Sequence, residues 1–276
     1  MKQWTIITIV FLSATAAVAD TLTGPDFKLL FNASGQVTLG VHMYGKNRST
    51  DLAPGYRAEM MNYTDMVSYK GLIFDFLTGA TTSIARLQET PVKLDKIRYV
   101  LAPGLRYPLR KTMAALILNH ECIHTISRDE VQGSTWWNAL QLSAGTKGAY
   151  HYYLVEKYNN RDFSLRNAFD AQVTCGYYFH GKAALIGHNH DYRNDLSGLL
   201  RCHFGLFRNH TFYADVKPSL WYSRGGDLSS KLSVEINYVI LAYDNIATLY
   251  YNHCIRDDTP YDNESSLGAV GFKVIF

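Results

Sequence analysis

Apolar and polar residues alternate one by one along most of the chain. In residues 232–243 (LSVEINYVILAY), one face carries Leu232, Val234, Ile236, Tyr238, Ile240 and Ala242, and the other face begins with Ser233, Glu235 and Asn237. Residues 170–179, 200–206 and 212–222 repeat this pattern. A period of two puts successive side chains on opposite faces of a β-strand. The pattern therefore predicts an all-β protein whose strands have one apolar and one polar face.

The order of these segments predicts a closed barrel rather than separate sheets. About 14 strands are expected from the alternation, at 37–44, 70–77, 82–88, 97–107, 114–126, 136–145, 150–158, 169–179, 182–189, 198–208, 211–222, 231–243, 246–255 and 267–276. Short connections, such as 78–81 and 146–149, alternate with long ones, such as 45–69. This arrangement is typical of transmembrane antiparallel up-and-down β-barrels. Residues 182–189 fit least well, so 12 strands is the alternative. A soluble β-sandwich would show the same alternation.

The N-terminus has the pattern of a cleaved secretory signal. Lys2 precedes the apolar run 4–12 (WTIITIVFL), and Ala17-Val18-Ala19 forms an A-x-A cleavage site. The apolar run is too short for a membrane-spanning helix, which needs roughly 20 residues. We therefore expect residues 1–19 to be a cleaved signal peptide that exports the chain. Residues 20–36 are expected to be a periplasmic lead-in or plug, and residues 37–276 the barrel.

The C-terminal residues LGAVGFKVIF alternate up to a terminal phenylalanine. Val270, Phe272, Val274 and Phe276 share one face. This segment resembles the C-terminal signal strand of Gram-negative outer-membrane β-barrels. The resemblance implies a location in the bacterial outer membrane. It also implies two kinds of partner, namely outer-membrane lipid with lipopolysaccharide, and the barrel-assembly machinery that reads the strand ending at Phe276.

Composition agrees with a barrel and gives no sign of nucleic-acid binding. The chain has 27 basic and 24 acidic residues without a basic run, and it contains 20 tyrosines that suit interfacial girdles. Trp136-Trp137 is expected in such a girdle rather than in a sugar platform. The cysteines, Cys122, Cys175, Cys202 and Cys254, show no CxxC spacing, and sequence does not choose among their possible pairings. No cofactor motif is present.

The polar faces of the predicted strands should line the interior of the barrel. They carry charges of both signs, at Arg98, Arg106, Arg201, His203, Asp215, Lys217 and Glu235. A barrel of this size either holds a water-filled channel or is filled by its own side chains. The sequence thus favours a small-solute channel or a structural barrel over an enzyme.

Residues 119–126 (NHECIHTI) contain the His-Glu-x-x-His pattern. On a helix, His120 and His124 would bind zinc and Glu121 would act as the base of a metalloprotease. That protease would need further helices, which the chain scarcely offers. On a strand, His120, Cys122 and His124 share the more apolar face and should face lipid, while Asn119 and Glu121 face the interior. No metal site is then expected.

The strand interpretation gives one enzymatic alternative. A histidine and a nucleophile two residues apart on the outer wall resemble the His-x-Ser pair of the lipid A deacylase family. The resemblance implies hydrolysis of a lipid ester with His120 as base and Cys122 as nucleophile. The sequence departs from that family in three places. Cys122 replaces its serine, Ile123 replaces its asparagine, and Ser134 stands where its acid would lie on the next strand.

Overall fold

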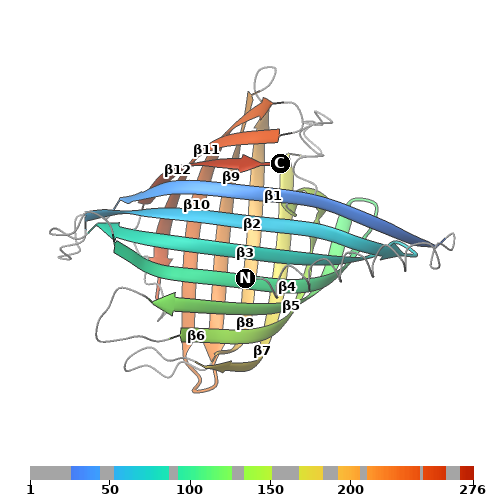
Figure 1. Ribbon diagram of the computed structural model, residues 1–276, viewed down its shortest axis with the longest axis horizontal. Coiled ribbons are helices and arrows are strands. Elements are labelled where there is room, and N and C mark those ends of the chain that lie inside the picture. Colours follow the sequence, from blue (N-terminus) through green and yellow to red (C-terminus); the bar gives the residue numbers. More distant parts are fainter. Residues whose placement is uncertain are drawn as a thin grey trace, which may run out of the picture.

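The structure is a computed structural model that describes residues 26–43, 53–86, 93–125, 134–150, 168–182, 192–205, 210–242, 245–258 and 268–276. In these residues the chain forms 12 antiparallel strands, each paired with its neighbours in sequence, and β1 pairs with β12 to close the barrel. Figure 1 shows β1 to β6 on the near wall, with β8 to β10 crossing behind them. Within the described residues, no helix is long and apolar enough to cross a membrane.

The strands are long compared with those expected from sequence. Their bounds are β1 Phe27–Met43, β2 Ala53–Tyr69, β3 Leu72–Arg86, β4 Lys93–Pro108, β5 Thr112–Thr125, β6 Ser134–Thr146, β7 Phe169–Lys182, β8 Tyr192–Gly205, β9 His210–Ser223, β10 Leu228–Ala242, β11 Asn245–Asp257 and β12 Gly268–Ile275. One short 3-10 helix, η1 (Lys147–Ala149), follows β6.

The predicted count of 14 strands is wrong, and the alternative of 12 is correct. The strands expected at 70–77 and 82–88 are one strand, β3, because the residues 78–81 (TGAT) continue the ladder instead of turning. Residues 45–69 were expected to be a loop, yet β2 occupies most of them. Strands expected at 150–158 and 182–189 fall almost entirely outside the described residues.

The expected boundary at residue 37 is also wrong, because β1 already begins at Phe27. Residues 27–36 are therefore wall and not a lead-in or plug. They pair with β2 as far as Tyr69, apart from a register shift between Leu29 and Asn32. The signal peptide expected at 1–19 lies outside the described residues.

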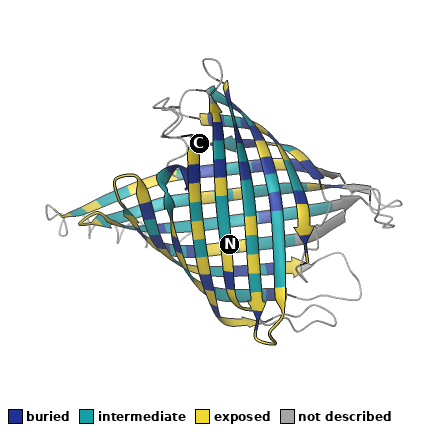
Figure 2. Cartoon of the chain, turned by 180° about the vertical axis from the view of Figure 1, so that it is seen from behind, coloured by how far each residue is buried: buried dark blue, intermediate teal, exposed yellow. Residues whose placement is uncertain are grey.

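The exposed face of the strands is largely apolar, and the buried charged side chains point inwards. The exposed large hydrophobic residues include Leu101, Leu116, Leu118, Leu140, Leu142, Leu196 and Leu200. Buried and exposed positions alternate along the strands in Figure 2. Hydrocarbon contains no water to form hydrogen bonds with the backbone, so a spanning sheet must pair all its strands by closing on itself. A closed barrel with an apolar exterior meets this requirement.

The two ends of the barrel differ. One end, called the terminal end, carries the start of β1 and the end of β12, and its connections include the two-residue turn Lys70-Gly71 between β2 and β3. Both turn residues have positive φ, 49° and 83°, which suits the tight turn of a β-hairpin. The opposite end, called the loop end, includes the connections 44–52, 183–191 and 258–267. The other connections at the terminal end, 109–111, 206–209 and 243–244, are short, except for 147–168, which is the longest between any two strands.

Two small clusters of buried apolar side chains lie in the interior at the terminal end, beside a cavity of about 340 Å³. Tyr213, Val239, Ile246 and Ile275 form one buried cluster, and Met113, Ala149 and Tyr150 form another. Ala149 and Tyr150 belong to residues 147–150, which we call the inner strap. Arg201 Nη1 donates to the Gly148 carbonyl at 3.2 Å, and the Tyr150 hydroxyl lies 3.0 Å from Ser143 Oγ. The strap is thus held inside the barrel.

Candidate functional site on the outer wall

The His-Glu-x-x-His residues form part of strand β5 and not a helix. Glu121 is only 4% exposed and points inwards, whereas Leu116 and Leu118 on the alternate face are exposed outwards. His120 and His124 share this outer face, about 13 Å apart along the strand. Two ligands at that separation cannot hold one zinc ion, and Glu121 lies on the other side of the wall. The zinc-protease interpretation is therefore wrong.

The outward side chains of β5 make two close polar contacts. Cys122 Sγ lies 3.1 Å from His124 Nε2, and His120 Nδ1 lies 2.7 Å from Asn138 Oδ1 on β6. An amide oxygen only accepts hydrogen bonds, so His120 Nδ1 carries the proton in this contact. That tautomer leaves His120 Nε2 free to accept a proton.

Strand register brings these groups together from three strands. Cys122 pairs with Trp136 on β6 and with Tyr99 on β4, and His120 pairs with Asn138. The rings of Tyr99 and His124 approach edge to face, with centroids 6.0 Å apart. Directly opposite residues in a sheet share one face, so this register determines which side chains meet.

A β-bulge adds a third histidine from β7. The register between β6 and β7 shifts after Asn138, so that His180 pairs with Asn138 and Tyr178 with Ala139. The His180 ring then packs edge-on against Trp136, with centroids 4.7 Å apart. Bulges often redirect side chains beside functional sites. We call His120, Cys122, His124, Asn138 and His180 the wall cluster.

The wall cluster combines a nucleophile with possible bases. A thiol beside an imidazole is the arrangement used in nucleophilic catalysis, and the amide that orients a second imidazole is a further element of such sites. Among the described residues, no group of three histidine, cysteine or acidic side chains could hold a metal ion. All four cysteines are free. The wall cluster therefore offers the side-chain types that nucleophilic catalysis uses.

The charged residues expected in the interior form buried ion pairs there. Arg201 makes a bidentate pair with Asp215 at 2.7 and 2.8 Å, and His203 Nε2 lies 2.8 Å from Asp170. Arg106 is buried between Asp65 and Asp75 and lies 2.9 Å from the latter. These pairs satisfy charges that would be costly if left alone in the interior.

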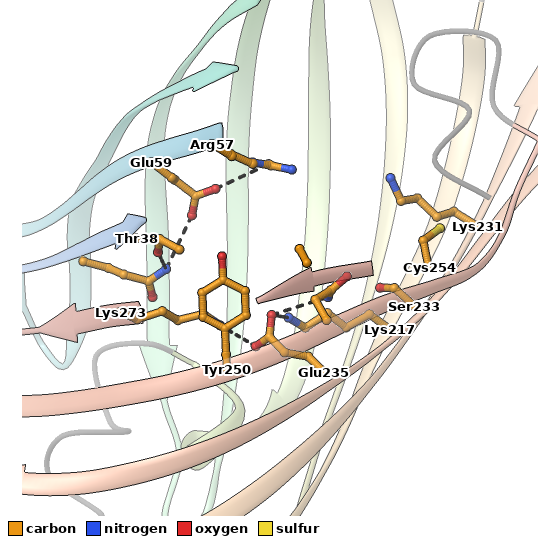
Figure 3. A pocket seen from close by; sticks show the side chains of 13 residues that line it. Thr38, Arg57, Glu59, Lys217, Lys231, Ser233, Glu235, Tyr250, Cys254 and Lys273 are labelled. Carbon is orange, nitrogen blue, oxygen red and sulfur yellow. Dashed lines mark hydrogen bonds and ion pairs between the residues drawn. The ribbon is translucent and has the colours of Figure 1, made fainter. Parts of the chain in front are cut away.

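Glu235 is the centre of a second group of charges. It pairs with Lys217 at 3.3 Å and with Lys273, and it accepts a hydrogen bond from Asn237 at 3.0 Å. Figure 3 shows Glu235, Lys217 and Lys273 beside Tyr250. Nearer the loop end, Arg98 pairs with Glu121.

Three cavities inside the barrel are lined by described residues, with volumes of about 280, 340 and 360 Å³. Lys217 lines all three. The smallest, shown in Figure 3, extends from Lys217 and Glu235 to Arg57 and Glu59 across the lumen. Charged side chains therefore line each of these cavities.

The sequence did not predict several members of the wall cluster and of the charged interior. Asn138 was not recognised, because its partnership with His120 depends on the register between β5 and β6. His180 was assigned to a turn, and only the bulge places it beside Trp136. Lys273 was overlooked within an apolar terminal segment, although its place between Val274 and Phe272 assigns it to the inner face. Asp129 and Glu130, the acids nearest to Ser134, lie outside the described residues.

Comparison with known proteins identifies the fold but no close relative. No protein-family model and no curated protein matches the sequence. Among solved structures, an outer membrane channel from Pseudomonas putida F1 has a TM-score of 0.56 at 8% identity, over 91% of this chain and 97% of that one. Outer membrane phospholipase A from Escherichia coli has a TM-score of 0.51 at 10% identity, over 90% and 94%. The chain has the fold of an outer-membrane β-barrel.

A second structure of the Escherichia coli phospholipase, in which an active-site asparagine is replaced by alanine, gives a TM-score of 0.51 at 9% identity, over 90% and 91% of the two chains. Channel and phospholipase therefore match this barrel about equally well. The fold alone does not distinguish transport from hydrolysis.

Proposed function

We propose that this chain is an outer-membrane β-barrel that hydrolyses ester bonds of lipids in the outer leaflet. The observation that carries the proposal is the contact of 3.1 Å between Cys122 Sγ and His124 Nε2 on the lipid-facing wall. Polar side chains are unfavourable on such a surface, and ionisable groups at membrane depth commonly mark function.

The ends of the barrel give the orientation for this proposal. In outer-membrane barrels the short turns are periplasmic and the longer loops extracellular. Four of the five connections at the terminal end have two to four residues, so this end would face the periplasm, with 147–168 as the one long connection on that side. The wall cluster lies near the end of β5, at Thr125, and so towards the loop end. It would therefore meet ester groups of the outer leaflet, while the leucines below it contact the acyl chains.

The reaction has two halves. The Cys122 thiol gives its proton to His124 Nε2, its sulfur bonds to the ester carbonyl carbon, and the C–O bond breaks. The leaving alkoxide takes the proton from His124, and the acyl group remains on Cys122 as a thioester. Water then gives a proton to His120 Nε2 and bonds to the carbonyl carbon. The C–S bond breaks, the fatty acid leaves, and the Cys122 thiolate takes the proton from His120 Nε2.

His120 suits the second half because Asn138 fixes its tautomer. With Nδ1–H donated to the amide at 2.7 Å, Nε2 can accept a proton from water. An asparagine also serves in the active site of the phospholipase that shares this fold. The sequence suggested His120 as the base for Cys122, whereas the thiol contact favours His124 in that role.

The first test measures fatty-acid release by the refolded protein. The substrates are micelles containing phosphatidylethanolamine and, separately, purified lipid A, so that the two lipid sources are distinguished. We expect Cys122→Ala to lower the rate roughly a thousandfold. Cys175→Ala is the matched control, because Cys175 is an exposed cysteine on β7 outside the wall cluster. Absence of release from both lipids would exclude the hydrolase.

A second test separates the roles of the two histidines. His120→Ala should accumulate acylated protein, because the thioester forms but water is not activated. His124→Ala should fail to acylate. Mass spectrometry of the intact protein after mixing with substrate detects the added acyl group. Equal acylation in both variants would contradict the assignment.

A small-solute channel is less well supported by the structure. A solute would have to pass Tyr150, Tyr213 and Ile275, which are buried at the terminal end and line the cavity of about 340 Å³ beside the inner strap. We therefore propose hydrolysis at the wall rather than transport through the lumen.

A further inference from the structure

The largest of the three cavities lies at the loop end and is rich in aromatic side chains. Its volume is about 360 Å³. Trp137, Tyr178, Tyr192 and Trp221 line it together with Arg98, Asn119, Glu121, Ile123, Gln141, Asp195, Ser197, Lys217, Ser219, Lys231 and Ser233. Tyr192 begins β8 and Trp221 lies two residues before the end of β9, so the cavity is near the rim.

Three of the aromatic side chains, Tyr178, Tyr192 and Trp221, form a row. The ring centroids of Tyr178 and Tyr192 are 5.9 Å apart, and those of Tyr192 and Trp221 are 6.3 Å apart. A register shift between Tyr192 and Asn194 accompanies the inward position of Tyr192. Tyr178 is the buried end of the row, whereas Tyr192 and Trp221 are half-buried, and all three line the cavity.

Asp195 places a hydrogen-bond acceptor beside this row. Tyr178 hydrogen-bonds both Asp195 and Trp221. Asp195 is 9% exposed, and its Oδ1 atom has no hydrogen-bond partner among the described residues. Gly176 is required beneath it, because a Cβ there would collide with Asp195 Oδ1. Oδ1 is packed against Gly176, but the Asp195 side chain lines the cavity. Its carboxylate therefore supplies an acceptor for a ligand hydroxyl there.

The charges around the cavity are largely balanced. Arg98 pairs with Glu121, Lys231 pairs with Asp257 at 3.0 Å, and Lys217 pairs with Glu235. The cavity therefore has no strong preference for a cation or an anion. Uncharged donors and acceptors, at Asn119, Gln141, Ser197, Ser219 and Ser233, make up much of the remaining lining.

We propose that this cavity binds a neutral saccharide that enters from the loop end. The C–H face of a pyranose ring packs on aromatic rings, and its hydroxyl groups need several donors and acceptors at the edges. The cavity supplies both, with a few polar groups placed around an aromatic surface. The site lies on the inner side of the wall, so it is independent of hydrolysis at the wall cluster.

The test is a titration of tryptophan fluorescence in the refolded, full-length barrel. The probes are maltohexaose and chitohexaose, in a detergent without a sugar head group. We expect saturable quenching by at least one probe. Trp221→Phe and Asp195→Asn should each weaken that binding at least tenfold. Heat-modifiability on gels verifies that each variant is folded.

Tyr222→Phe is the matched control, because Tyr222 is the next residue on β9 and points outwards. It should bind the probe as the wild type does. The absence of saturable quenching by both saccharides would overturn the proposal. Equal binding by folded Trp221→Phe and Asp195→Asn variants would overturn it too, as would saturable quenching by adenosine without any response to saccharide.

Discussion

In the barrel interior, Arg201 binds Asp215 through two hydrogen bonds while both side chains are shielded from water. Asp215→Asn would leave the guanidinium without its main counter-charge. We expect the free energy of unfolding to fall by about 3–5 kcal/mol, as for other broken buried pairs. Urea unfolding in micelles measures the change.

Glu59→Gln is the comparison for this prediction. Glu59 pairs with Arg57 at 3.5 Å, and both side chains are 23–29% exposed. Loss of so exposed a pair should cost only about 0–1 kcal/mol. An Asp215→Asn variant as stable as Glu59→Gln would show that Arg201 finds another partner.

Asp258 follows β11 and makes the stability of the loop end weakly dependent on pH. Hydrogen bonds from the Ser230 backbone N–H and from Arg256, the latter at 2.6 and 3.1 Å, hold the pKa of Asp258 below its ordinary value. The carboxylate thus stabilises the folded state above the pKa of the unfolded chain, about 3.9. This contribution is lost as pH falls through the lower folded value.

We expect Asp258→Asn to lose less stability than the wild type when the pH is lowered from 7 to 3. The effect should be small because Asp258 is solvent-exposed. Urea midpoints at both pH values give the comparison. A larger acid-induced loss in the variant would contradict the assigned sign.

Single-residue alternation predicted which way β5 side chains point, but not which neighbours they meet. Glu121 inwards and Cys122 outwards follow from a period of two. The contact between His120 and Asn138 requires the register of two strands, and that of His180 requires a bulge. Neither register nor bulge is encoded in the local pattern.

At the level of strands, the main errors arose where polar or small residues were interpreted as loops. Strand β2 contains Arg57, Glu59 and Asp65, which face the lumen, so their charges are compatible with a spanning strand. Gly79 in β3 suggested a turn, but it makes room for the Met61 side chain of β2. In a barrel with a polar interior, a strand can carry several charged residues, so it is harder to recognise from sequence than a strand that packs on an apolar core. The assembly signal at Phe276 stays a prediction.

The seam between β1 and β12 depends on two glycines. Gly40 pairs with Gly271, and the Tyr250 side chain covers both. A Cβ at Gly271 would lie 2.7 Å from Gly40 Cα and would collide with the Leu39 carbonyl. Gly271→Ala should therefore open the seam and abolish the heat-modifiable, folded form seen on gels.

Gly225, in the turn between β9 and β10, is the control. A Cβ there would meet no atom closer than 3.6 Å. Gly225→Ala should fold as the wild type does. A Gly271→Ala variant with unchanged heat-modifiability would show that the two strands can separate slightly without losing closure.

For the whole molecule, the packed terminal end predicts a barrel that conducts ions poorly. Single-channel recording in a planar bilayer should show no stable open state for the wild type. Tyr150→Ala removes a large side chain from the inner strap and from the cluster around Met113, and it should introduce measurable openings. A steady conductance of the wild type would instead support the small-solute channel that the sequence favoured.

The neighbours Trp136 and Trp137 belong to opposite faces of β6, one beside the wall cluster and the other in the loop-end cavity. A single peptide step therefore separates an indole that meets lipid from one that meets water. Brominated lipids should quench the fluorescence of Trp136 and leave that of Trp137 unchanged, while a water-soluble quencher should do the reverse. The two neighbouring tryptophans of β6 therefore act as separate fluorescent probes of the lipid-facing and the lumen-facing side of the barrel wall.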